Sequence, residues 1–422
     1  NWASFTPLIL IWRCSGLTRA NCQRRWAWIR CQIKASLNQA QKRLTQTTTK
    51  WVACVLNAGL SLTTSNPHAW FLDDLKSVKP NGIKVMSTFA CGGGSSMGYK
   101  RAGCEVIAAN DIDPEMAWHY KLNLKPKHYF LCPINELLTK ELPPELFELD
   151  ILDGSPPCST FSMAGSREKA WGKEKHFREG QAKQVLSDLF FDYLDLVGRL
   201  RPKVAIAENV KGMLIGNAKG YTKMVMSRFK ELGYRPQLFL LNAADCGVPQ
   251  RRERVFFVAV RNDIDVPPLK LAPQHPWISA GDATSDIQTL TAAEIAETRP
   301  TPEALQFWSK TKQGDSFAKA KERATGKANG FGRVRIAEQL PSATLTSHAG
   351  DFYHWTQCRR LTLRESKRLG SFPDDYQAKT DKIGKYMIGM SVPPKMTEQV
   401  ARAVCEQWLG VQYESKTRTP GL

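Results

Sequence analysis

The chain has 422 residues, of which 42% are hydrophobic and 23% charged, and its formal net charge is +19. A chain of this length and ordinary composition forms one large core with a smaller lobe, or two domains. The charge favours a polyanionic partner such as nucleic acid over an acidic small molecule, although a membrane surface would also attract it. No apolar run is long enough to cross a bilayer, so we expect no membrane-spanning segment.

The cysteine pattern argues against two structural classes. The sequence contains 11 cysteines, an odd number, and no C-x-x-C pair. This pattern indicates neither a disulfide framework nor a zinc ribbon. We therefore expect reduced thiols in an intracellular compartment, and no metal centre.

The N-terminal region is basic and has no clear period. Residues 1–72 contain no Asp or Glu and carry Arg13, Arg19, Arg24, Arg25, Arg30, Lys34, Lys42, Arg43 and Lys50. A nucleic-acid-binding arm, a targeting segment of the acid-poor type and a gene start placed too far upstream all fit this composition. We favour the third interpretation, because the chain opens on Asn and Met86 lies just before the first strong motif. Residues 1–82 are thus expected to be an extension, disordered or not native, without assigned function.

A nucleotide-binding pattern begins at Ile83. Successive residues predict a strand, a tight glycine turn, a helix and a second strand: Ile83–Phe89, Cys91–Gly94, Ser95–Arg101 and Glu105–Ala109. The second strand closes on Asn110 and Asp111. Glycines let a ligand approach the helix N-terminus, and an acid at the next strand end can accept hydrogen bonds from a ribose. A turn that only requires positive φ is the alternative for the glycines alone.

The alternation of helices and strands continues to residue 261. The predicted elements are a helix at Pro114–Leu122, a strand at Asp150–Leu152, a helix at Ala182–Leu200 and strands at Val204–Ala207, Gln237–Leu241 and Val255–Val260. We therefore expect residues 83–261 to form an α/β domain with a doubly wound, mostly parallel sheet. Its functional loops should gather at the carboxyl ends of the strands.

One cysteine follows a rigid turn at a predicted strand end. Ile151 and Leu152 form the apolar run, and Gly154, Pro156 and Pro157 end regular pairing before Cys158. A thiol held beyond a strand end can act as a nucleophile. For an isolated cysteine, a small buried side chain is the commoner role.

Further candidate catalytic groups lie at Glu208 and in the segment 249–255. Glu208 ends an apolar strand, where a buried surface would raise its pKa and suit it to donate a proton. Arg252 and Arg254 would share one face of a strand, where two guanidinium groups suit a phosphate, a carboxylate or a carbonyl oxygen. A structural ion pair and a basic surface cluster are the ordinary alternatives.

The second half of the chain is less regular. Residues 262–335 show no strand and helix alternation, and Phe317–Arg335 is rich in Lys and Arg. Such a run is usually a solvated face, but the total charge favours phosphate contact. Helical spacing returns at Leu361–Leu369 and Pro394–Trp408, so residues 336–410 should complete the lobe and pack back on the sheet, followed by a tail at 411–422.

The order of these motifs resembles the DNA (cytosine-5) methyltransferase family between about Val85 and Val404. The similarity rests on Phe89 through Gly98, Asn110-Asp111, Ser155-Pro156-Pro157-Cys158, Glu208-Asn209-Val210, Gln250 through Arg254, Arg360-Leu361-Thr362 with Glu365 and Phe372-Pro373, and Gly389 through Pro394. The resemblance implies a Rossmann-like methyltransferase sheet with a smaller, irregular target-recognition lobe at residues 262–335. It also implies S-adenosylmethionine as cofactor and duplex DNA as substrate.

The resemblance assigns roles to individual residues. Cys158 would add to C6 of a flipped cytosine, Glu208 would protonate or hydrogen-bond N3, and Arg252, with Arg254 beside it, would bind the base carbonyl oxygen. The implied cofactor contacts are Phe89, Ala90, Cys91, Gly92, Gly93, Gly94, Asp111, Ile112, Ile134, Pro157, Leu189, Ser391 and Val392. The implied DNA contacts are Ser159, Arg167, Lys169, Lys319, Lys321, Arg323 and Arg333.

The sequence departs from the family pattern at a few positions. Cys91 replaces a usual glycine, and Pro133 stands where an acid commonly holds the adenine amino group. Ser159 replaces a frequent Gln and Met390 a frequent Asn. These departures concern cofactor contacts, loop closure and base recognition, and none affects the expected nucleophile or acid.

Three other functions are compatible with some of these motifs. A folate-dependent pyrimidine-modifying enzyme also uses a Pro-Cys nucleophile, but the glycine loop with Asp111 argues against it. A tRNA methyltransferase of the same family shares the motifs, and a non-catalytic DNA-binding module would not need Cys158 and Glu208. We expect a monomer that acts in the cytoplasm, associated with the nucleoid, in a prokaryotic or phage-encoded setting.

Overall fold

In the computed structural model the described part of the chain begins at Asn66. The described residues are 66–157, 174–175, 184–185, 189–216, 218–326, 333–348 and 351–413. Cys158, Ser159, Arg167 and Lys169 lie outside them, as does most of the expected N-terminal extension. No helix in the described ranges is long and apolar enough to cross a membrane.

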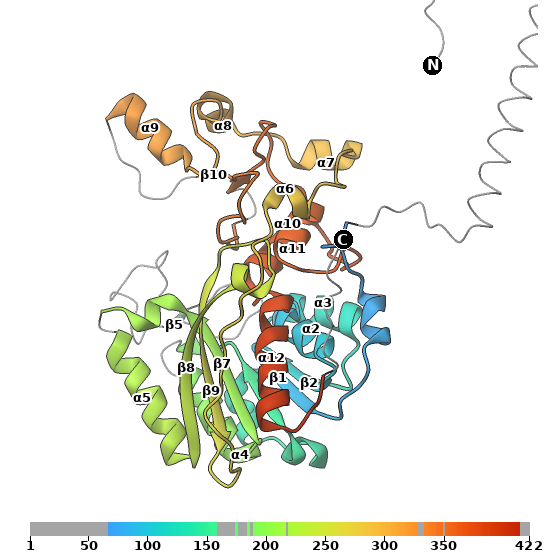
Figure 1. The fold of residues 1–422 in the computed structure, drawn as a ribbon, viewed down its shortest axis with the longest axis vertical. Coiled ribbons are helices and arrows are strands. Elements are labelled where there is room, and N and C mark those ends of the chain that lie inside the picture. Colours follow the sequence, from blue (N-terminus) through green and yellow to red (C-terminus); the bar gives the residue numbers. More distant parts are fainter. Residues whose placement is uncertain are drawn as a thin grey trace, which may run out of the picture. The chain divides into compact units, whose positions relative to one another are not determined.

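A seven-stranded sheet with the order β3-β2-β1-β4-β7-β9-β8 forms the centre of the unit (Figure 1). Its strands are β1 (Lys84–Thr88), β2 (Glu105–Asp111), β3 (His128–Leu131), β4 (Ile151–Gly154), β7 (Val204–Val210), β8 (Tyr234–Asn242) and β9 (Glu253–Arg261). Neighbouring strands from β3 to β7 are parallel, whereas β9 runs antiparallel to both β7 and β8. The predicted mostly parallel, Rossmann-like sheet is confirmed, and β9 is its one reversed strand.

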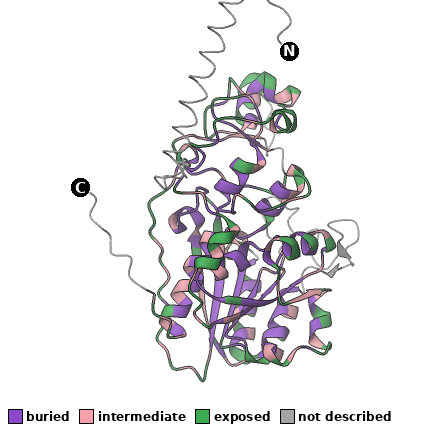
Figure 2. Ribbon diagram, turned by 90° about the vertical axis from the view of Figure 1, so that its right-hand side faces the viewer, coloured by how far each residue is buried: buried purple, intermediate pink, exposed green. Residues whose placement is uncertain are grey.

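Helices cover both faces of this sheet (Figures 1 and 2). On one face α2 (Gly94–Arg101) and α12 (Pro394–Trp408) enclose an apolar cluster that includes Val85, Ile151 and Ile206. On the other face α4 (Leu189–Leu200) and α5 (Ala218–Glu231) cover Met86, Leu152 and Ala205. Successive residues of a strand belong in turn to one cluster and to the other, because side chains along a strand point to opposite faces of the sheet. Apolar runs in the sequence therefore became strands that are buried on both sides.

Some elements differ from the sequence prediction. The described part of the helix predicted at Ala182–Leu200 is α4 (Leu189–Leu200), and Gln184–Val185 form the short strand β6, paired with β5 (Glu174–Lys175). The sequence analysis missed β3, whose side chains are half-buried or exposed, and the helix α5. The helix predicted at Pro114–Leu122 is confirmed as α3 (Pro114–Leu124), which is capped by Asp113. Edge strands of this kind lack the apolar run that identifies a central strand.

The segment from Asn66 to Gly82 is packed although it was assigned to the extension. Trp70 is 5% exposed, and its indole Nε1 donates a hydrogen bond to the carbonyl oxygen of Ser371 at 2.9 Å. The backbone N–H of Asp374 donates to the carbonyl oxygen of Trp70 at 2.9 Å. Residues just before β1 thus join the C-terminal part of the chain.

The second half of the chain forms short helices and small strand pairs at the end of the unit where α7, α8 and α9 lie (Figure 1). These elements are α6 (Ala280–Ala283), α7 (Ala292–Glu297), α8 (Pro302–Phe307), α9 (Phe317–Thr325), β10 (Val334–Arg335) and β11 (Phe352–Tyr353). The chain then returns through α10 (Leu363–Leu369) and α11 (Asp381–Met390) to α12. The expected irregular lobe and its return to the sheet are both present.

The C-terminal end of the described chain packs against the segment just before β1 and the end of α2. The Tyr413 hydroxyl donates to the carbonyl oxygen of Ala102 at 2.8 Å, and the Asn81 amide donates to the Tyr413 hydroxyl at 3.3 Å. Nearby, the buried thiols of Cys104 and Cys405 lie 3.6 Å apart. The segment after α12 is therefore anchored next to the segment before β1.

We predict that Gly98→Ala lowers the free energy of unfolding by about 2 kcal/mol. A Cβ atom at Gly98 would lie 2.5 Å from the carbonyl oxygen of Pro394 and 2.5 Å from Cβ of Thr397, so α2 and α12 would have to move apart. Thermal or urea unfolding measures the change. Gly220→Ala in α5 is the matched control, because a Cβ atom there meets nothing within 4 Å and should stabilise the helix slightly. Equal effects of the two substitutions would contradict the conclusion that the close packing of α2 on α12 requires glycine at position 98.

Candidate active site

The carboxyl ends of the parallel strands bring the sequence motifs to one edge of the sheet. The glycine loop follows β1, Asp111 ends β2, the Pro-Pro turn follows β4, and Glu208 lies near the end of β7. Ile112 follows β2, and Ile134 begins the short helix η2 (Ile134–Leu138) after β3. Such an edge is where open α/β sheets place their ligands.

The backbone of the glycine loop adopts left-handed conformations at alternate positions. The φ angles are 52° at Phe89, 46° at Cys91 and 82° at Gly93. A side chain at positive φ is strained, so the structure explains why glycine is usual at the position of Cys91. The loop is held by Asp111, whose Oδ2 atom accepts a hydrogen bond from the backbone N–H of Cys91 at 2.7 Å. The backbone N–H of Asp113 donates to Oδ1 of Asp111 at 2.9 Å.

The Asp111 carboxyl titrates at a higher pH than an exposed aspartate. Burial raises its pKa to about 6, while the hydrogen bonds from the backbone N–H groups of Asp113 and Cys91 act in the opposite direction. The group is therefore ionised at neutral pH and can accept further hydrogen bonds, as a ribose-binding acid must.

Segments from the C-terminal part of the chain close over the glycine loop. The Tyr376 hydroxyl donates to the carbonyl oxygen of Gly92 at 2.7 Å. A Cβ atom at Gly94 would lie 2.2 Å from the carbonyl oxygen of Val392 and 2.8 Å from Cβ of Ser391. The predicted cofactor residues Ser391 and Val392 thus contact the start of α2 directly, although almost 300 positions of sequence separate them from it.

Two buried hydroxyl groups near this loop have no partner among the described residues. They are Tyr129 Oη on β3 and Ser391 Oγ. Burial raises the pKa of Tyr129, and the negative charge of Asp111 adds to the effect, so the phenol is neutral. Buried polar atoms normally form hydrogen bonds, and a polar ligand beside Asp111 would supply them. The donors and acceptors present therefore fit a nucleoside-containing cofactor such as S-adenosylmethionine.

The turn that precedes Cys158 is tied to the strand that carries Glu208. The Asn209 side-chain amide donates to the carbonyl oxygen of Pro156 at 3.1 Å in the interior. Gly154, before the turn, fits against Tyr193, since a Cβ atom there would lie 2.6 Å from its ring. The turn and the end of β7 are therefore held together.

Glu208 and Arg254 form an ion pair at the edge of the sheet. Arg254 Nε lies 2.9 Å from Glu208 Oε1, and their side chains are 14% and 10% exposed. Burial lowers the pKa of Arg254, and the adjacent Glu208 carboxylate opposes that effect. Antiparallel pairing of β7 with β9 places the two residues on neighbouring strands, with Phe256 opposite Glu208. The structural ion pair that the sequence left open as the alternative role of Glu208 is present, at the position predicted for the proton donor.

Arg252 has a different environment from Arg254. Its Nη1 and Nη2 groups donate to the carbonyl oxygens of Leu345 and Gly389, both at 2.9 Å, and the residue is 3% exposed. Gln250 similarly accepts from the backbone N–H of Leu345 at 3.0 Å. The side chain of Arg252 thus joins segments of the return region, whereas Arg254 faces Glu208.

The remaining predicted cofactor residues are distributed around the same edge. Ala90, Ile134 and Leu189 are buried, Ile112 and Pro157 are half-buried, and Leu189 begins α4. Pro133 is the N-cap residue of η2, and Met390 at the end of α11 is 49% exposed. The apolar residues can line the cofactor site but donate no side-chain hydrogen bonds to it.

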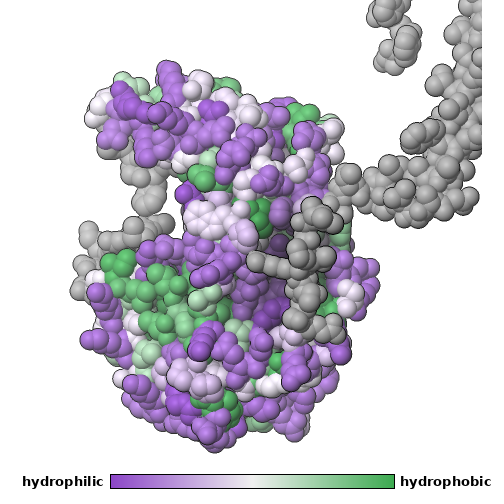
Figure 3. Space-filling view, in the orientation of Figure 1, coloured by the Kyte–Doolittle hydropathy of each residue, from purple (hydrophilic) through white to green (hydrophobic). Residues whose placement is uncertain are grey.

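The predicted DNA-contacting side chains of the lobe are mostly engaged within the lobe. Lys319 lies 2.7 Å from Asp315, and Lys321 lies 3.8 Å from Glu303, which also pairs with Arg333. Arg323 donates to the carbonyl oxygen of Lys310 at 3.4 Å. Figure 3 shows hydrophilic surface over the region of α8 and α9, and hydrophobic surface over β8. The lobe surface is polar, but these cations already have partners.

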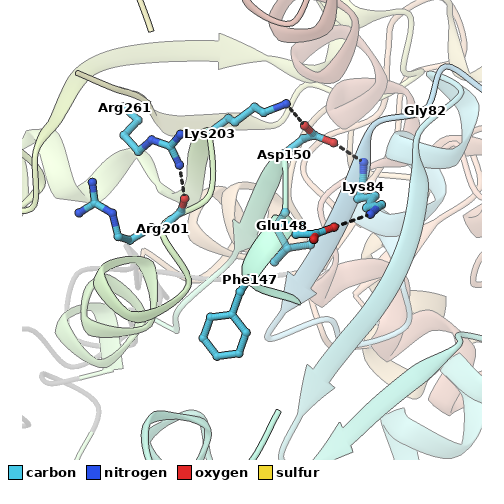
Figure 4. A pocket seen from close by; sticks show the side chains of 9 residues that line it. Gly82, Lys84, Phe147, Glu148, Asp150, Arg201, Lys203 and Arg261 are labelled. Carbon is cyan, nitrogen blue, oxygen red and sulfur yellow. Dashed lines mark hydrogen bonds and ion pairs between the residues drawn. The ribbon is translucent and has the colours of Figure 1, made fainter. Parts of the chain in front are cut away.

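A polar pocket of about 440 Å³ lies at the opposite edge of the sheet (Figure 4). Lys84 begins β1, and Asp150 and Lys203 immediately precede β4 and β7. Lys203 pairs with Asp150 at 2.7 Å, and Lys84 pairs with Glu148 at 3.2 Å. Arg201 and Arg261 also line the pocket, and it lies at the amino ends of the strands, away from the active-site edge.

Sequence reasoning missed some residues that the structure brings to the site. Tyr129 lies on the unpredicted strand β3, and Tyr376 has no local signal, because only the folded chain places it on Gly92. Asn209 follows Glu208 directly and could have been recognised as a second side chain at the strand end. Among the described residues, no group of three or more His, Cys, Asp or Glu side chains could hold a metal ion.

Comparisons with known proteins agree with this arrangement. A family model for C-5 cytosine-specific DNA methylases matches residues 83–406. The type II methyltransferase M.NgoPII of Neisseria gonorrhoeae is 27% identical over 343 residues, which cover 77% of this chain and 96% of that protein. The type II methyltransferase M.AplI of Arthrospira platensis is 30% identical over 333 residues, covering 76% and 85%.

Solved structures share the fold at lower sequence identity. An E. coli prophage protein described as a DNA modification methyltransferase superimposes with a TM-score of 0.59 and 19% identity, covering 77% of this chain and 99% of that one. A DNMT2 mutant of Spodoptera frugiperda gives a TM-score of 0.55 at 18% identity, covering 76% and 99%.

We predict that Arg252→Ala lowers the free energy of unfolding by about 3 kcal/mol, because it leaves two buried carbonyl oxygens without donors. Chemical denaturation measures the loss. Arg251→Ala is the matched control, since the neighbouring Arg251 side chain is exposed and its removal should change stability by less than about 0.5 kcal/mol. A stable Arg252→Ala protein would mean that these hydrogen bonds do not hold the return segment.

Proposed function

The chain belongs to the C-5 cytosine-specific DNA methylase family, and from that premise we propose that it transfers a methyl group from S-adenosylmethionine to C5 of cytosine in a specific duplex DNA sequence. As an enzyme it is a DNA (cytosine-5) methyltransferase, with type II methyltransferases as relatives. The detailed proposal rests on the contact between the turn before Cys158 and the end of β7, which carries Glu208. Asn209 binds the turn before Cys158, and its neighbour Glu208 pairs with Arg254.

In this proposal the cytosine leaves the duplex stack before it reacts, because its ring edge is inaccessible inside the helix. The thiolate of Cys158 forms a bond to C6, and Glu208 donates a proton or a hydrogen bond to N3, so that negative charge does not accumulate on the ring. S-adenosylmethionine supplies an electrophilic methyl group to the activated C5. The C5 proton would pass to solvent, and the electrons of that C–H bond would restore the C5–C6 double bond as the C6–S bond breaks. The N3 proton would return to Glu208, so that methylated cytosine, S-adenosylhomocysteine and free Cys158 remain.

We propose that Arg254, more than Arg252, contacts the base. Both Nη groups of Arg252 donate to backbone carbonyl oxygens, so this side chain orients the return segment. Arg254 holds Glu208 through Nε and donates to the carbonyl oxygen of Glu253 through Nη1, so its guanidinium group lies directly beside the proposed proton donor, whereas the Nε of Arg252, which has no partner among the described residues, is buried behind its two backbone contacts. A guanidinium group with a remaining donor beside the proton donor suits the carbonyl oxygen of cytosine.

Asp111 and the glycine loop would hold the cofactor. The ionised Asp111 carboxylate suits the ribose hydroxyls, and the left-handed loop allows the ligand to approach the backbone at the start of α2. Tyr129 Oη and Ser391 Oγ are buried, have no hydrogen-bond partner within the described ranges of the chain, and are available to the same ligand. The cofactor would thus be held by residues from both ends of the chain.

The irregular lobe would recognise the DNA sequence. Residues 262–335 lie where target recognition is expected, and the charge of +19 favours DNA binding. Since Lys319, Lys321 and Arg333 pair with acids in the lobe, phosphate contact by these side chains would require exchange of partners. We further propose a monomer in a prokaryotic or phage-encoded setting, near the nucleoid.

Labelled methyl transfer tests the substrate and the nucleophile together. We expect transfer from S-adenosylmethionine to duplex DNA, and loss of at least about 1,000-fold in kcat for Cys158→Ser, because a hydroxyl is a far weaker nucleophile than a thiolate. Cys246→Ser, at a buried thiol outside the site, is the control and should keep its activity. Label in tRNA but not in DNA would refute the proposed substrate, and full turnover by Cys158→Ser would refute the nucleophile.

DNA containing 5-fluorocytosine should trap the covalent step. Fluorine at C5 cannot leave as a proton does, so the bond between C6 and the Cys158 sulfur should persist. Peptide mass spectrometry of the denatured adduct identifies the attached cysteine. An adduct on Cys91 or on any cysteine other than Cys158 would overturn the assignment.

Cofactor binding should depend on the ionisation of Asp111. Because the pKa of Asp111 is about 6, the dissociation constant of S-adenosylmethionine should rise as the pH falls through 6, up to tenfold for each further unit. The protonated carboxyl is a poorer acceptor for the ribose hydroxyls. Isothermal titration calorimetry between pH 5 and 8 measures the trend, and Asp111→Asn should bind weakly with no such slope. A steep slope in Asp111→Asn would assign the effect to another group.

A further inference from the structure

Two buried cysteines lie in contact where α12 packs beside the start of β2. The Sγ atoms of Cys104 and Cys405 are 3.6 Å apart, and the two residues are 5% and 0% exposed. Cys104 immediately precedes β2, and Cys405 belongs to α12. Both are free thiols. They lie away from the active-site edge, because that edge is formed by the carboxyl ends of the parallel strands.

A disulfide bond between these residues requires only a small movement. The sulfur atoms of a disulfide are about 2.05 Å apart, so the two Sγ atoms would have to approach each other by about 1.6 Å. Rotation about the Cα–Cβ bonds of the two cysteines can supply a movement of this size. The fold therefore brings together two thiols that 301 positions of sequence separate, at a distance suited to a covalent bond.

The two thiols differ in acidity. The hydrogen bond from Cys104 lowers the pKa of Cys405, burial opposes this effect, and the Tyr413 hydroxyl and the positive charge of Arg402 lower the pKa further. The same hydrogen bond raises the pKa of Cys104, and burial adds to the rise. Cys405 is therefore the residue of the pair that more readily forms a thiolate, which is the reactive form of cysteine.

The segment Val411–Tyr413 covers the pair after the end of α12. The backbone N–H of Val411 donates to the carbonyl oxygen of Cys405 at 2.9 Å, and the Tyr413 hydroxyl donates to that of Ala102 at 2.8 Å. The Tyr413 ring lies 4.6 Å from the guanidinium carbon of Arg402. A short, partly exposed segment held by few contacts opens more readily than a core strand, so a small oxidant can reach the thiols without unfolding of the sheet.

We propose that Cys104 and Cys405 are a site of reversible oxidation, where a peroxide converts the two thiols into a disulfide that joins α12 to the start of β2. The Cys405 thiolate attacks one oxygen of hydrogen peroxide, the O–O bond breaks, and hydroxide leaves, so that Cys405 becomes a sulfenic acid. The Cys104 sulfur gives up its proton and attacks the Cys405 sulfur, and the S–O bond breaks. The two thiols thus lose two electrons and two protons, and one peroxide becomes two molecules of water.

The disulfide would stabilise the contact that closes the cofactor loop. α12 follows Ser391 and Val392 directly, and its first residues pack on α2. A covalent bond near the other end of α12 would hold this helix on the sheet. It would also close a long loop in the unfolded chain, which lowers the entropy of the unfolded state. The oxidised protein should therefore unfold at a higher temperature than the reduced protein.

Mass spectrometry identifies the bond in the full chain. The protein is treated with hydrogen peroxide, the remaining thiols are blocked with N-ethylmaleimide in denaturant, and the chain is digested with trypsin. We expect the peptides 102–121 and 403–416, each of which contains one cysteine, to be joined and to separate on treatment with dithiothreitol. Cys104→Ser should lack the joined peptides. Cys246→Ser is the matched control, because Cys246 is also a buried free thiol, and it should form them to the same extent as the wild type.

Thermal unfolding tests the effect of the bond. The melting temperature of the oxidised wild type should exceed that of the reduced wild type by about 5 °C. This comparison needs no variant, so it stands even where a substitution weakens folding. Oxidation should not raise the melting temperature of Cys104→Ser or Cys405→Ala. Neither measurement involves methyl transfer, so both are independent of the proposed function.

Two outcomes overturn the inference. One is the recovery of Cys104 and Cys405 as separate peptides after peroxide treatment, whether they carry N-ethylmaleimide, are oxidised singly or are joined to other cysteines. The other is a joined pair whose melting temperature equals or falls below that of the reduced protein, because such a bond would strain α12 instead of holding it on the sheet.

Discussion

The contact of α2 with the segment that leads into α12 is the constraint on which the site depends. It requires glycine at Gly94 and Gly98, where a Cβ atom would lie 2.2 Å and 2.5 Å from backbone carbonyl oxygens of Val392 and Pro394. Because the backbones touch, Ser391 reaches the glycine loop, and the loop is closed between β1 and the C-terminal region. The cofactor site is therefore a product of the whole fold and not of the first β-α-β unit alone.

The sequence predicted those parts of the fold that carry strong local signals. Apolar runs identified β1, β4 and β7, and the glycine turn with Asp111 identified the nucleotide-binding edge. It missed β3 because the strand has four half-buried or exposed residues. Contacts between residues that are far apart in the sequence could not be predicted either. Arg252 and Arg254 look equivalent in sequence, but only the fold shows that Arg252 binds carbonyl oxygens 93 and 137 positions away.

Composition also fails to predict which charged side chains are paired, because the pairs form only in the folded chain. The basic run at Phe317–Arg335 suggested cations free for DNA, yet the described lysines and arginines there find acids or carbonyl oxygens in the lobe. Inside the sheet the situation is reversed, because the buried Asp153 carboxyl accepts hydrogen bonds from Ser87 and Tyr99 and forms no ion pair with any described residue. Net charge thus describes the attraction of the whole protein to a polyanion, whereas individual pairings decide the chemistry.

The anchoring of Tyr413 beside Asn81 and Ala102 closes the part of the chain between Asn81 and Tyr413 almost into a ring. In a ring the physical order of motifs around the site does not depend on where the polypeptide is opened. A circularly permuted chain, with the two ends joined at this contact and new ends in a surface loop, would bury the same core and form the same edge. The linear succession of motifs that makes the family easy to recognise is thus a record of ancestry more than a requirement of folding.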